Sequence, residues 1–312
     1  MDAAPKIARA EDWASAFRLI FQYLPAEENE RRCANALHLL QSGELDPHGI
    51  FVLRGDEGLR GALVCLPVPG GSALVWPPGA VEDDCAVIED TLVKHAVSWL
   101  RRRGAKLAQT LLAPEEMFLA EPLLRNGFTL VTRLWYMRHD LNLPLEFLNL
   151  PARLDFQLFD NSVHFRQTLL RTYEDTRDCP EVNGVRTIDE VLEGHRAQGV
   201  FRPELWWLAL DEGRPVGVLI VTEMPESGDW EVAYMGVVPE ARRRGFGREM
   251  LLHVLCAARA ADAPGVMLSV DARNQPAWNL YRSLGFEPYD QRAVYLAIFV
   301  EKVISPSGEP GA

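Results

Sequence analysis

One segment, running from Val237 to about Ala260, constrains the fold of this 312-residue chain more than any other. The apolar residues up to Val238 have the length and composition of a strand, and the basic turn Arg242–Arg248 follows shortly after them. Apolar side chains then recur at helical spacing, so a helix is predicted from Gly245 to about Ala260. A strand that leads through a glycine-containing turn into a helix is typical of α/β folds.

The basic turn has the chemistry of an anion-binding site. Backbone N–H groups at the start of a helix are unpaired and carry partial positive charge. Gly245 and Gly247 lack a Cβ, so the oxygens of a pyrophosphate can approach the backbone between Arg243 and Arg248. The alternative interpretation is a tight helix start with a solvated arginine cluster.

A second segment, Asn274–Phe286, supplies a phenol. Its side chain belongs to Tyr281, which lies in the helix predicted at 277–284, shortly after Asn274. A phosphate site with a nearby phenol predicts a nucleotide-bearing cofactor whose chemistry needs a proton donor. Two structural alternatives remain open. Asn274 is suited to cap the helix before Pro276, and Tyr281 could be a core residue.

The two halves of the chain repeat the same order of predicted elements. In the carboxyl half these are helices at 163–172, 188–198, 245–260 and 277–284, and strands at 205–210, 216–221, 230–238, 266–270 and 293–300. In the amino half, Asp56–Val64 echoes the hairpin segment Asp211–Leu219, and Leu123–Phe128 echoes Tyr281–Phe286. A helix at about 86–103 and a strand at 107–110 lie between these echoes. The sequence therefore predicts a duplicated domain.

The two copies are not equivalent in chemistry. Before its long helix the amino copy has Trp76–Asp84, which lacks the Arg-x-x-Gly-x-Gly pattern and ends in acidic residues that would repel a pyrophosphate. It also has Leu123 where the carboxyl copy has Tyr281. We predict a degenerate, non-catalytic domain at 1–142, a proline-rich linker at 143–151, a catalytic domain at 152–304 and a disordered tail at 305–312.

Composition narrows the class of protein. A formal net charge of −12 argues against a protein devoted to nucleic acid or to anionic membranes, and no apolar run is long enough to span a bilayer. Five scattered cysteines without a Cys-x-x-Cys pair indicate reduced thiols, and no residues have metal-ligand spacing. With no signal pattern at the amino end, a cytoplasmic location is expected.

Both segments carry a resemblance to a known family. The carboxyl half resembles a GNAT-type acetyl-CoA-dependent N-acetyltransferase, over about 202–300. Arg242, Gly245 and Gly247 match the Arg/Gln-x-x-Gly-x-Gly/Ala motif of that family. The residues that match its Asn-x-x-Ala-x-x-Leu-Tyr-x-x-x-Gly-Phe motif are Asn274, Ala277, Leu280, Tyr281, Gly285 and Phe286. The resemblance implies an α/β fold with a mixed sheet, here as two tandem GNAT-like domains. In layout the chain is similar to two-domain members such as mycothiol synthase.

The resemblance also implies roles for individual residues. Acetyl-CoA is the expected co-substrate, held by Val237, Val238, Arg242, Arg243, Arg244, Gly245, Phe246, Gly247, Arg248, Asn274 and Tyr281. In the family the strand ending at Val237 splays, and a strand N–H polarises the thioester carbonyl. Tyr281 would protonate the departing thiolate. Glu231, at the place of a catalytic glutamate in histone-type members, would take a proton from the amine. A structural role for Glu231 remains open, with Asp175 and Glu174 as weak substitutes.

The acceptor site is predicted in the segment between the first helices of the carboxyl copy. Its candidate residues are Tyr173 and Asp175, together with whichever of Trp206 and Trp207 faces the site, because adjacent strand residues point to opposite faces. Cys179 is more consistent with an idle thiol than with a nucleophile.

Together these features predict an enzyme that moves an acetyl group from acetyl-CoA to a primary amine of a small metabolite in a ternary complex. One alternative is acetylation of a protein N-terminus or lysine. An alternative from another class is a non-catalytic acyl-CoA sensor. A longer acyl donor also remains open, and the oligomeric state is not determined by the sequence.

Overall fold

A computed structural model describes residues 4–56, 58–81, 84–142 and 153–300. The chain divides into two compact units. Unit 1 comprises residues 1–131 and 293–304, and unit 2 comprises residues 132–292 and 305–312. The predicted linker at 143–151 and the tail at 305–312 lie outside the described residues.

Unit 1 contains a mixed sheet with the strand order β1-β2-β3-β4-β6-β13, and the short β5 pairs with β3. Its strands are β1 (Lys6–Ile7), β2 (Ile50–Gly55), β3 (Gly58–Val68), β4 (Ser72–Val75), β5 (Gly79–Ala80) and β6 (Leu107–Leu112), with the end of β13 (Glu287–Ile298). Its helices are α1 (Trp13–Ile20), α2 (Ala26–Ser42), α3 (Cys85–Arg102) and α4 (Glu121–Arg125).

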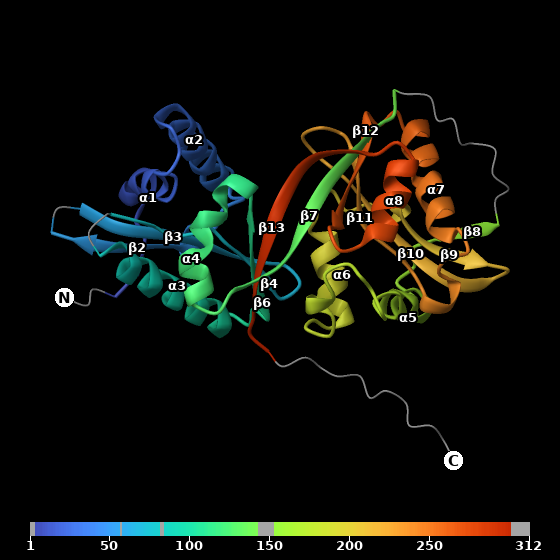
Figure 1. Cartoon of the computed structure of the whole chain (residues 1–312), viewed down its shortest axis with the longest axis horizontal. Coiled ribbons are helices and arrows are strands. Elements are labelled where there is room, and N and C mark those ends of the chain that lie inside the picture. The colour runs from blue at the N-terminus through green and yellow to red at the C-terminus, as the bar shows by residue number, and fades with distance from the viewer. Residues whose placement is uncertain (1–3, 57, 82–83, 143–152, 301–312) are drawn as a thin grey trace, which may run out of the picture. The chain divides into compact units, whose positions relative to one another are not determined.

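Alternating side chains of β2 divide the core of unit 1 into two layers. Ile50 and Val52 pack with α1 and α2, whereas Phe51 and Leu53 pack with α3. Helices α1 and α2 lie on one face of the sheet and α3 on the other (Figure 1). This is the expected result of a strand buried on both faces.

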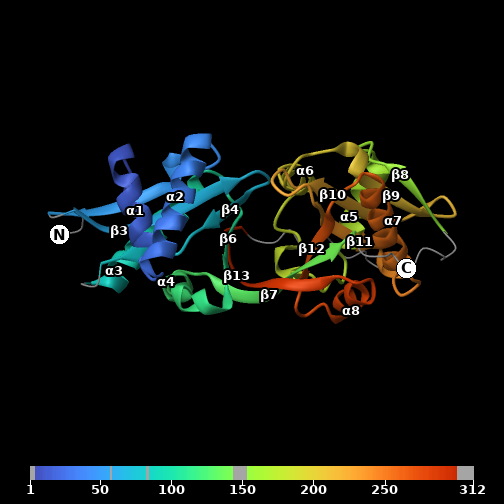
Figure 2. The same ribbon diagram turned by 90° about the horizontal axis from the view of Figure 1, so that it is seen from above.

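Unit 2 has the strand order β7-β12-β11-β10-β9-β8. Its strands are β7 (Thr129–Asp140), β8 (Leu154–Leu158), β9 (Trp206–Asp211), β10 (Arg214–Glu223), β11 (Trp230–Val237) and β12 (Gly265–Asp271). Its helices are α5 (Val163–Thr172), α6 (Ile188–Arg196), α7 (Phe246–Ala260) and α8 (Gln275–Ser283). Helix α5 packs on β10 and β11, and α7 packs on β11 and β12 (Figure 2).

Local sequence accounts for several boundaries in unit 2. The Ser162 hydroxyl accepts the Phe165 N–H at 3.2 Å and caps α5. Thr187 and Glu190 form a capping box at the start of α6. Between β9 and β10, Glu212 and Gly213 both have positive φ, as a tight hairpin turn requires. The predicted helix 163–172 has the bounds of α5, whereas α6 ends earlier than predicted.

Both units have the same order of strands and helices, which confirms the predicted mixed α/β fold. The units exchange their last strands, however. Residues 134–140 of β7 pair with β12 in unit 2, and residues 293–298 of β13 pair with β6 in unit 1. The units therefore differ from the consecutive domains 1–142 and 152–304 predicted from the sequence. A strand pattern reports which face is buried, and it does not report which of two similar sheets the strand joins.

Candidate active site

Strands β11 and β12 of unit 2 diverge and create an opening in the sheet. They pair only from Trp230–Val266 to Val232–Leu268, so the rest of β11 has no strand partner on that side among the described residues. Hydrogen-bonded positions alternate along an antiparallel pair. The Val238 N–H donates to the Val216 carbonyl at 3.0 Å, so the backbone groups of Met235 and Val237 face the opening. This is the splayed strand that the family resemblance implies.

A cavity of about 850 Å³ occupies this region of unit 2. Segments from α5, the loop after it, β11, the basic turn and α8 line it. The residues that line the cavity include Thr172, Tyr173, Asp175, Asp178, His195, Tyr234, Val237, Arg242, Arg243, Gly247, Arg248, Asn274 and Tyr281. The two sequence segments that predicted a cofactor site therefore open into one cavity.

The basic turn presents free backbone donors to the cavity. None of the backbone N–H groups of residues 243–247 donates to an acceptor within the described parts of the chain. Arg243 and Gly245 have left-handed φ values of 61° and 88°, which bend the turn into a concave arrangement of N–H groups. A Cβ at Gly247 would lie 3.4 Å from Leu280 of α8, so a side chain there would enter the space between the turn and that helix. This arrangement fits a pyrophosphate.

The arginines of the turn have different partners. Arg243 lines the cavity and has no ion-pair partner among the described residues. Arg248 also lines it and donates to Ser283 Oγ at 3.1 Å. Arg244 pairs with Asp211 at 2.9 Å over the ring of Phe246, which is itself buried. Arg244 and Phe246 can therefore contact a cofactor here through their backbones.

Arg242 binds protein carbonyl groups in this structure. Its guanidinium donates to the carbonyl oxygens of Val237 (3.0 Å), Thr172 (3.2 Å), Glu174 (2.5 Å) and Asp175 (3.2 Å). We call residues 173–183 the acceptor loop. Arg242 thus ties this loop to the end of β11, and its role in holding acetyl-CoA stays a prediction.

Tyr281 and Asn274 reach the cavity from α8 and its start. The Tyr281 ring is buried, which raises the pKa of its phenol, and no hydrogen bond joins its hydroxyl to another described residue. Its phenol is therefore protonated at neutral pH and available as a donor. Asn274 caps α8 by accepting the Ala277 N–H at 3.4 Å, so its capping role is present beside any cofactor contact.

Glu231 lies on the same face of the sheet as Tyr234, but it does not line the cavity. An irregularity in the pairing of β10 with β11 opposite Ala233 shifts the alternation and brings both side chains to one face. Burial raises the pKa of the Glu231 carboxyl. Its role as a base stays a prediction.

Two of the four candidate residues for the acceptor site lie at the cavity, and the other two do not. Tyr173 and Asp175 line the cavity, as predicted. Trp206 and Trp207 do not, because both are buried in the core of unit 2. Trp206 packs against Phe165 of α5 and Trp207 against His253 of α7, so neither tryptophan reaches the site.

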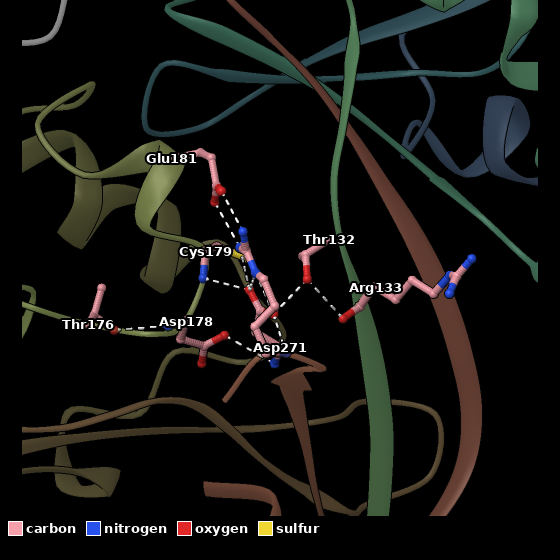
Figure 3. Close-up of polar contacts among 8 residues, drawn as sticks. Thr132, Arg133, Thr176, Asp178, Cys179, Glu181 and Asp271 are labelled. Carbon is pink, nitrogen blue, oxygen red and sulfur yellow. Dashed lines mark hydrogen bonds and ion pairs between the residues drawn. The ribbon is translucent and has the colours of Figure 1, made fainter. Parts of the chain in front are cut away.

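Beside the cavity lies a polar cluster that the sequence did not reveal (Figure 3). Asp271, fully buried at the end of β12, accepts hydrogen bonds from Arg273, Thr132 and the Cys179 N–H. Burial opposes ionisation, but these donors lower the pKa of Asp271 to about 2. Asp178 keeps accessible surface in the cavity, yet the surrounding protein and the charge of Asp271 raise its pKa to about 6.

His195 was also missed. Its Nδ1 lies 3.1 Å from Gln198 Oε1, and its buried Nε2 has no partner among the described residues. Burial lowers its pKa to about 4, so the ring is neutral at pH 7. Asp271 could have been predicted as a site residue, because a carboxylate at the end of a predicted strand is a recognisable sequence signal. His195 has no such signal in the sequence, because only folding brings α6 to the cavity.

The side chains of Asp178, Cys179 and Asp271 place possible metal ligands within 4.8 Å of one another. The guanidinium of Arg273 already binds Asp271 at 2.7 Å, and burial raises the pKa of the Cys179 thiol. Both features oppose the binding of a metal ion by these three side chains together. No helix of the described chain is long and apolar enough to cross a membrane.

Comparisons with known proteins agree with this geometry. Residues 169–286 match the model of the acetyltransferase (GNAT) family. A mycothiol acetyltransferase of Thermobispora bispora is 32% identical over 174 residues, which are 54% of this chain and 58% of that protein. The match thus spans little more than half the length of that relative.

Solved structures are similar over nearly the whole chain. A GCN5-related N-acetyltransferase from Sphaerobacter thermophilus has a TM-score of 0.60 and 18% identity, with 96% of each chain covered. A tandem GNAT protein from the clavulanic acid biosynthesis pathway has a TM-score of 0.50 and 16% identity, and covers 95% of this chain and 97% of its own. At these identities the likeness concerns the fold. Residues 169–286, which form most of the site, therefore match the GNAT acetyltransferase family, and the fold of the chain is similar to that of tandem GNAT structures.

Proposed function

We propose that this protein is an N-acetyltransferase that moves an acetyl group from acetyl-CoA directly to a primary amine of a small metabolite. The observation that carries the proposal is that the basic turn and Tyr281 line one cavity. Within the described chain, neither the N–H groups of residues 243–247 nor the Tyr281 hydroxyl has a hydrogen-bond partner. The GNAT family implies acetyl-CoA, and a concave anion site of this kind fits its pyrophosphate.

Bound acetyl-CoA would supply the thioester. In this proposal the basic turn binds the diphosphate, with Arg243 and Arg248 adding positive charge. The exposed backbone of Met235 and Val237 pairs with the pantetheine arm and polarises the carbonyl. Tyr281 donates its proton to the thiolate that leaves.

Glu231 is the proposed base. Its raised pKa suits proton acceptance, and its position on the face of Tyr234 but outside the cavity lining favours a relay through water. The cavity volume and the relative named mycothiol acetyltransferase support a small acceptor. We propose no particular metabolite, since the match to that relative covers 58% of it.

Unit 1 is proposed to have kept the fold and lost the chemistry. Leu123, at the place of Tyr281, is fully buried and offers no proton. Unit 2 is therefore expected to bind one acetyl-CoA per chain. A protein amino group as acceptor and a non-catalytic acyl-CoA sensor are the competing functions.

The test is calorimetric titration of acetyl-CoA into the full chain and into Gly247→Asp. The new carboxylate would face the pyrophosphate, so binding should weaken at least 100-fold. Ala260→Asp adds the same charge at the exposed far end of α7 and should leave affinity unchanged. Two sites per chain would show that unit 1 also binds, and no binding by the unmodified protein would refute the transferase.

A further inference from the structure

The acceptor loop carries a carboxylate into the cavity at Asp178. One of its oxygens, Oδ1, accepts the Asp271 N–H at 3.2 Å, and no other described residue donates to this carboxylate. Asp178 and Tyr281 line the same cavity. Burial is the main cause of the raised pKa of the Tyr281 phenol, and the charge of Asp178 adds to it.

The surrounding contacts hold Asp178 in place. Its own N–H donates to Thr176 Oγ1 at 3.1 Å, and the next N–H, that of Cys179, donates to Asp271 Oδ2 at 3.0 Å (Figure 3). Further along the loop, Glu181 receives two hydrogen bonds from Arg273 at 2.6 and 2.9 Å. A carboxylate fixed on this scaffold is preorganised to bind a ligand.

Nearby carboxylates are not equivalent to it. Asp271 is already saturated by donors, including Arg273, which also pairs with Glu181. Glu231 does not line the cavity. Asp178 lines the cavity together with Tyr281 and accepts one hydrogen bond from the described residues, so its carboxylate remains open to a cationic ligand.

We infer that Asp178 binds the ammonium group of the acceptor and selects amines that carry a positive charge in solution. The inference rests on the proposed transferase function and adds a specificity residue to it. A charge-assisted hydrogen bond would place the amine on the side of the cavity where Tyr281 lies. Asp178 is a binding group here, and the proton still leaves through the proposed Glu231 relay.

The experiment measures acetyl transfer by the full chain to propylamine, benzylamine and glucosamine, with aniline as an acceptor that is uncharged at pH 7. For the best cationic acceptor, Asp178→Asn should raise KM 10- to 100-fold, the effect of losing one charge-assisted hydrogen bond. The KM for aniline, if it is a substrate, should change less than threefold. Glu226→Gln removes an exposed negative charge of unit 2 outside the cavity lining and should leave the KM for the cationic acceptor within twofold.

A second readout separates binding from folding. The acetyl-CoA Kd of Asp178→Asn should match that of the unmodified protein. If it does not, Asp178→Glu, which retains the charge, should restore the acetyl-CoA Kd and part of the amine KM. An unchanged amine KM in an active Asp178→Asn variant overturns this inference alone. If the unmodified protein acetylates none of the amines, the proposed function fails and this inference fails with it.

Discussion

At the residue scale, Tyr281 illustrates how one position acquires a chemical role. Tyr281 packs in the core of unit 2 and also lines the cavity, so a core position is compatible with its proposed role as the acid. The motif predicted the residue. The absence of a competing hydrogen bond among the described residues is a property of the folded site.

Tyr281→Phe should lower kcat by 10²- to 10³-fold and leave the acetyl-CoA Kd within twofold, because the proton donor is lost and the packing is kept. Steady-state kinetics and calorimetry measure the two quantities. Tyr289→Phe removes an exposed phenol of β13 and serves as the control. Equal kcat in Tyr281→Phe and the unmodified protein would contradict the assignment.

Asp271 has a role in stability with a definite pH dependence. Its folded-state pKa of about 2 lies below the ordinary value of 3.8, so its contribution is present above pH 4 and is lost as pH falls toward 2. The shift corresponds to about 2 kcal/mol. Urea unfolding should show Asp271→Asn destabilised by about that amount at pH 7, with the difference shrinking as pH falls from 4 to 2. A constant difference across that range would argue against the ionised form as the source.

At the element scale, the basic turn joins two functions. Its residues line the cavity, while Arg242 binds the carbonyls of the acceptor loop and of β11. The sequence pattern shows a glycine turn before a helix and so predicts the backbone site. It does not show where an arginine side chain points, because the loop carbonyls come from residues about seventy positions earlier.

Arg242→Gln introduces glutamine, which the family motif accepts at this position, and removes most of the contacts of the guanidinium. Acceptor KM should rise by about tenfold and amide exchange in the acceptor loop should accelerate, since several charge-assisted hydrogen bonds are lost. The acetyl-CoA Kd should change less than threefold. Arg243→Gln should show the opposite pattern, with weaker acetyl-CoA binding and an unchanged loop. Hydrogen exchange and calorimetry distinguish the two variants, and the same pattern in both would contradict this division.

At the scale of the whole molecule, the exchanged strands make each unit depend on distant sequence. Met137, near the end of the amino-terminal half, is fully buried in the core of unit 2. Ala293 and Tyr295, near the carboxyl end, belong to a core cluster of unit 1. The units are therefore not interchangeable with consecutive pieces of chain.

Met137→Ala should destabilise unit 2 by about 2–5 kcal/mol, the usual cost of a large-to-small change in a core. Amide exchange should accelerate in β12, its pairing partner, more than in β6 of unit 1. Tyr295→Ala is the reciprocal variant and should affect β6 more than β12. If Met137→Ala accelerated amide exchange mainly in β6 and Tyr295→Ala mainly in β12, the strands would not be exchanged.

The sequence by itself predicted the elements of this protein and the two segments that line its cavity. Strand and helix patterns, caps and glycine turns act over a few residues, so α5, the basic turn and the helix carrying Tyr281 could be predicted from local chemistry. The repeat of these elements predicted two copies of one topology. Only the tertiary structure decided which sheet receives β7 and β13, which loop Arg242 ties down, and that Asp178 rather than Trp206 or Trp207 reaches the cavity. Those outcomes depend on contacts between segments far apart in the chain, and the free energy of such contacts leaves no periodic trace in the residues that make them.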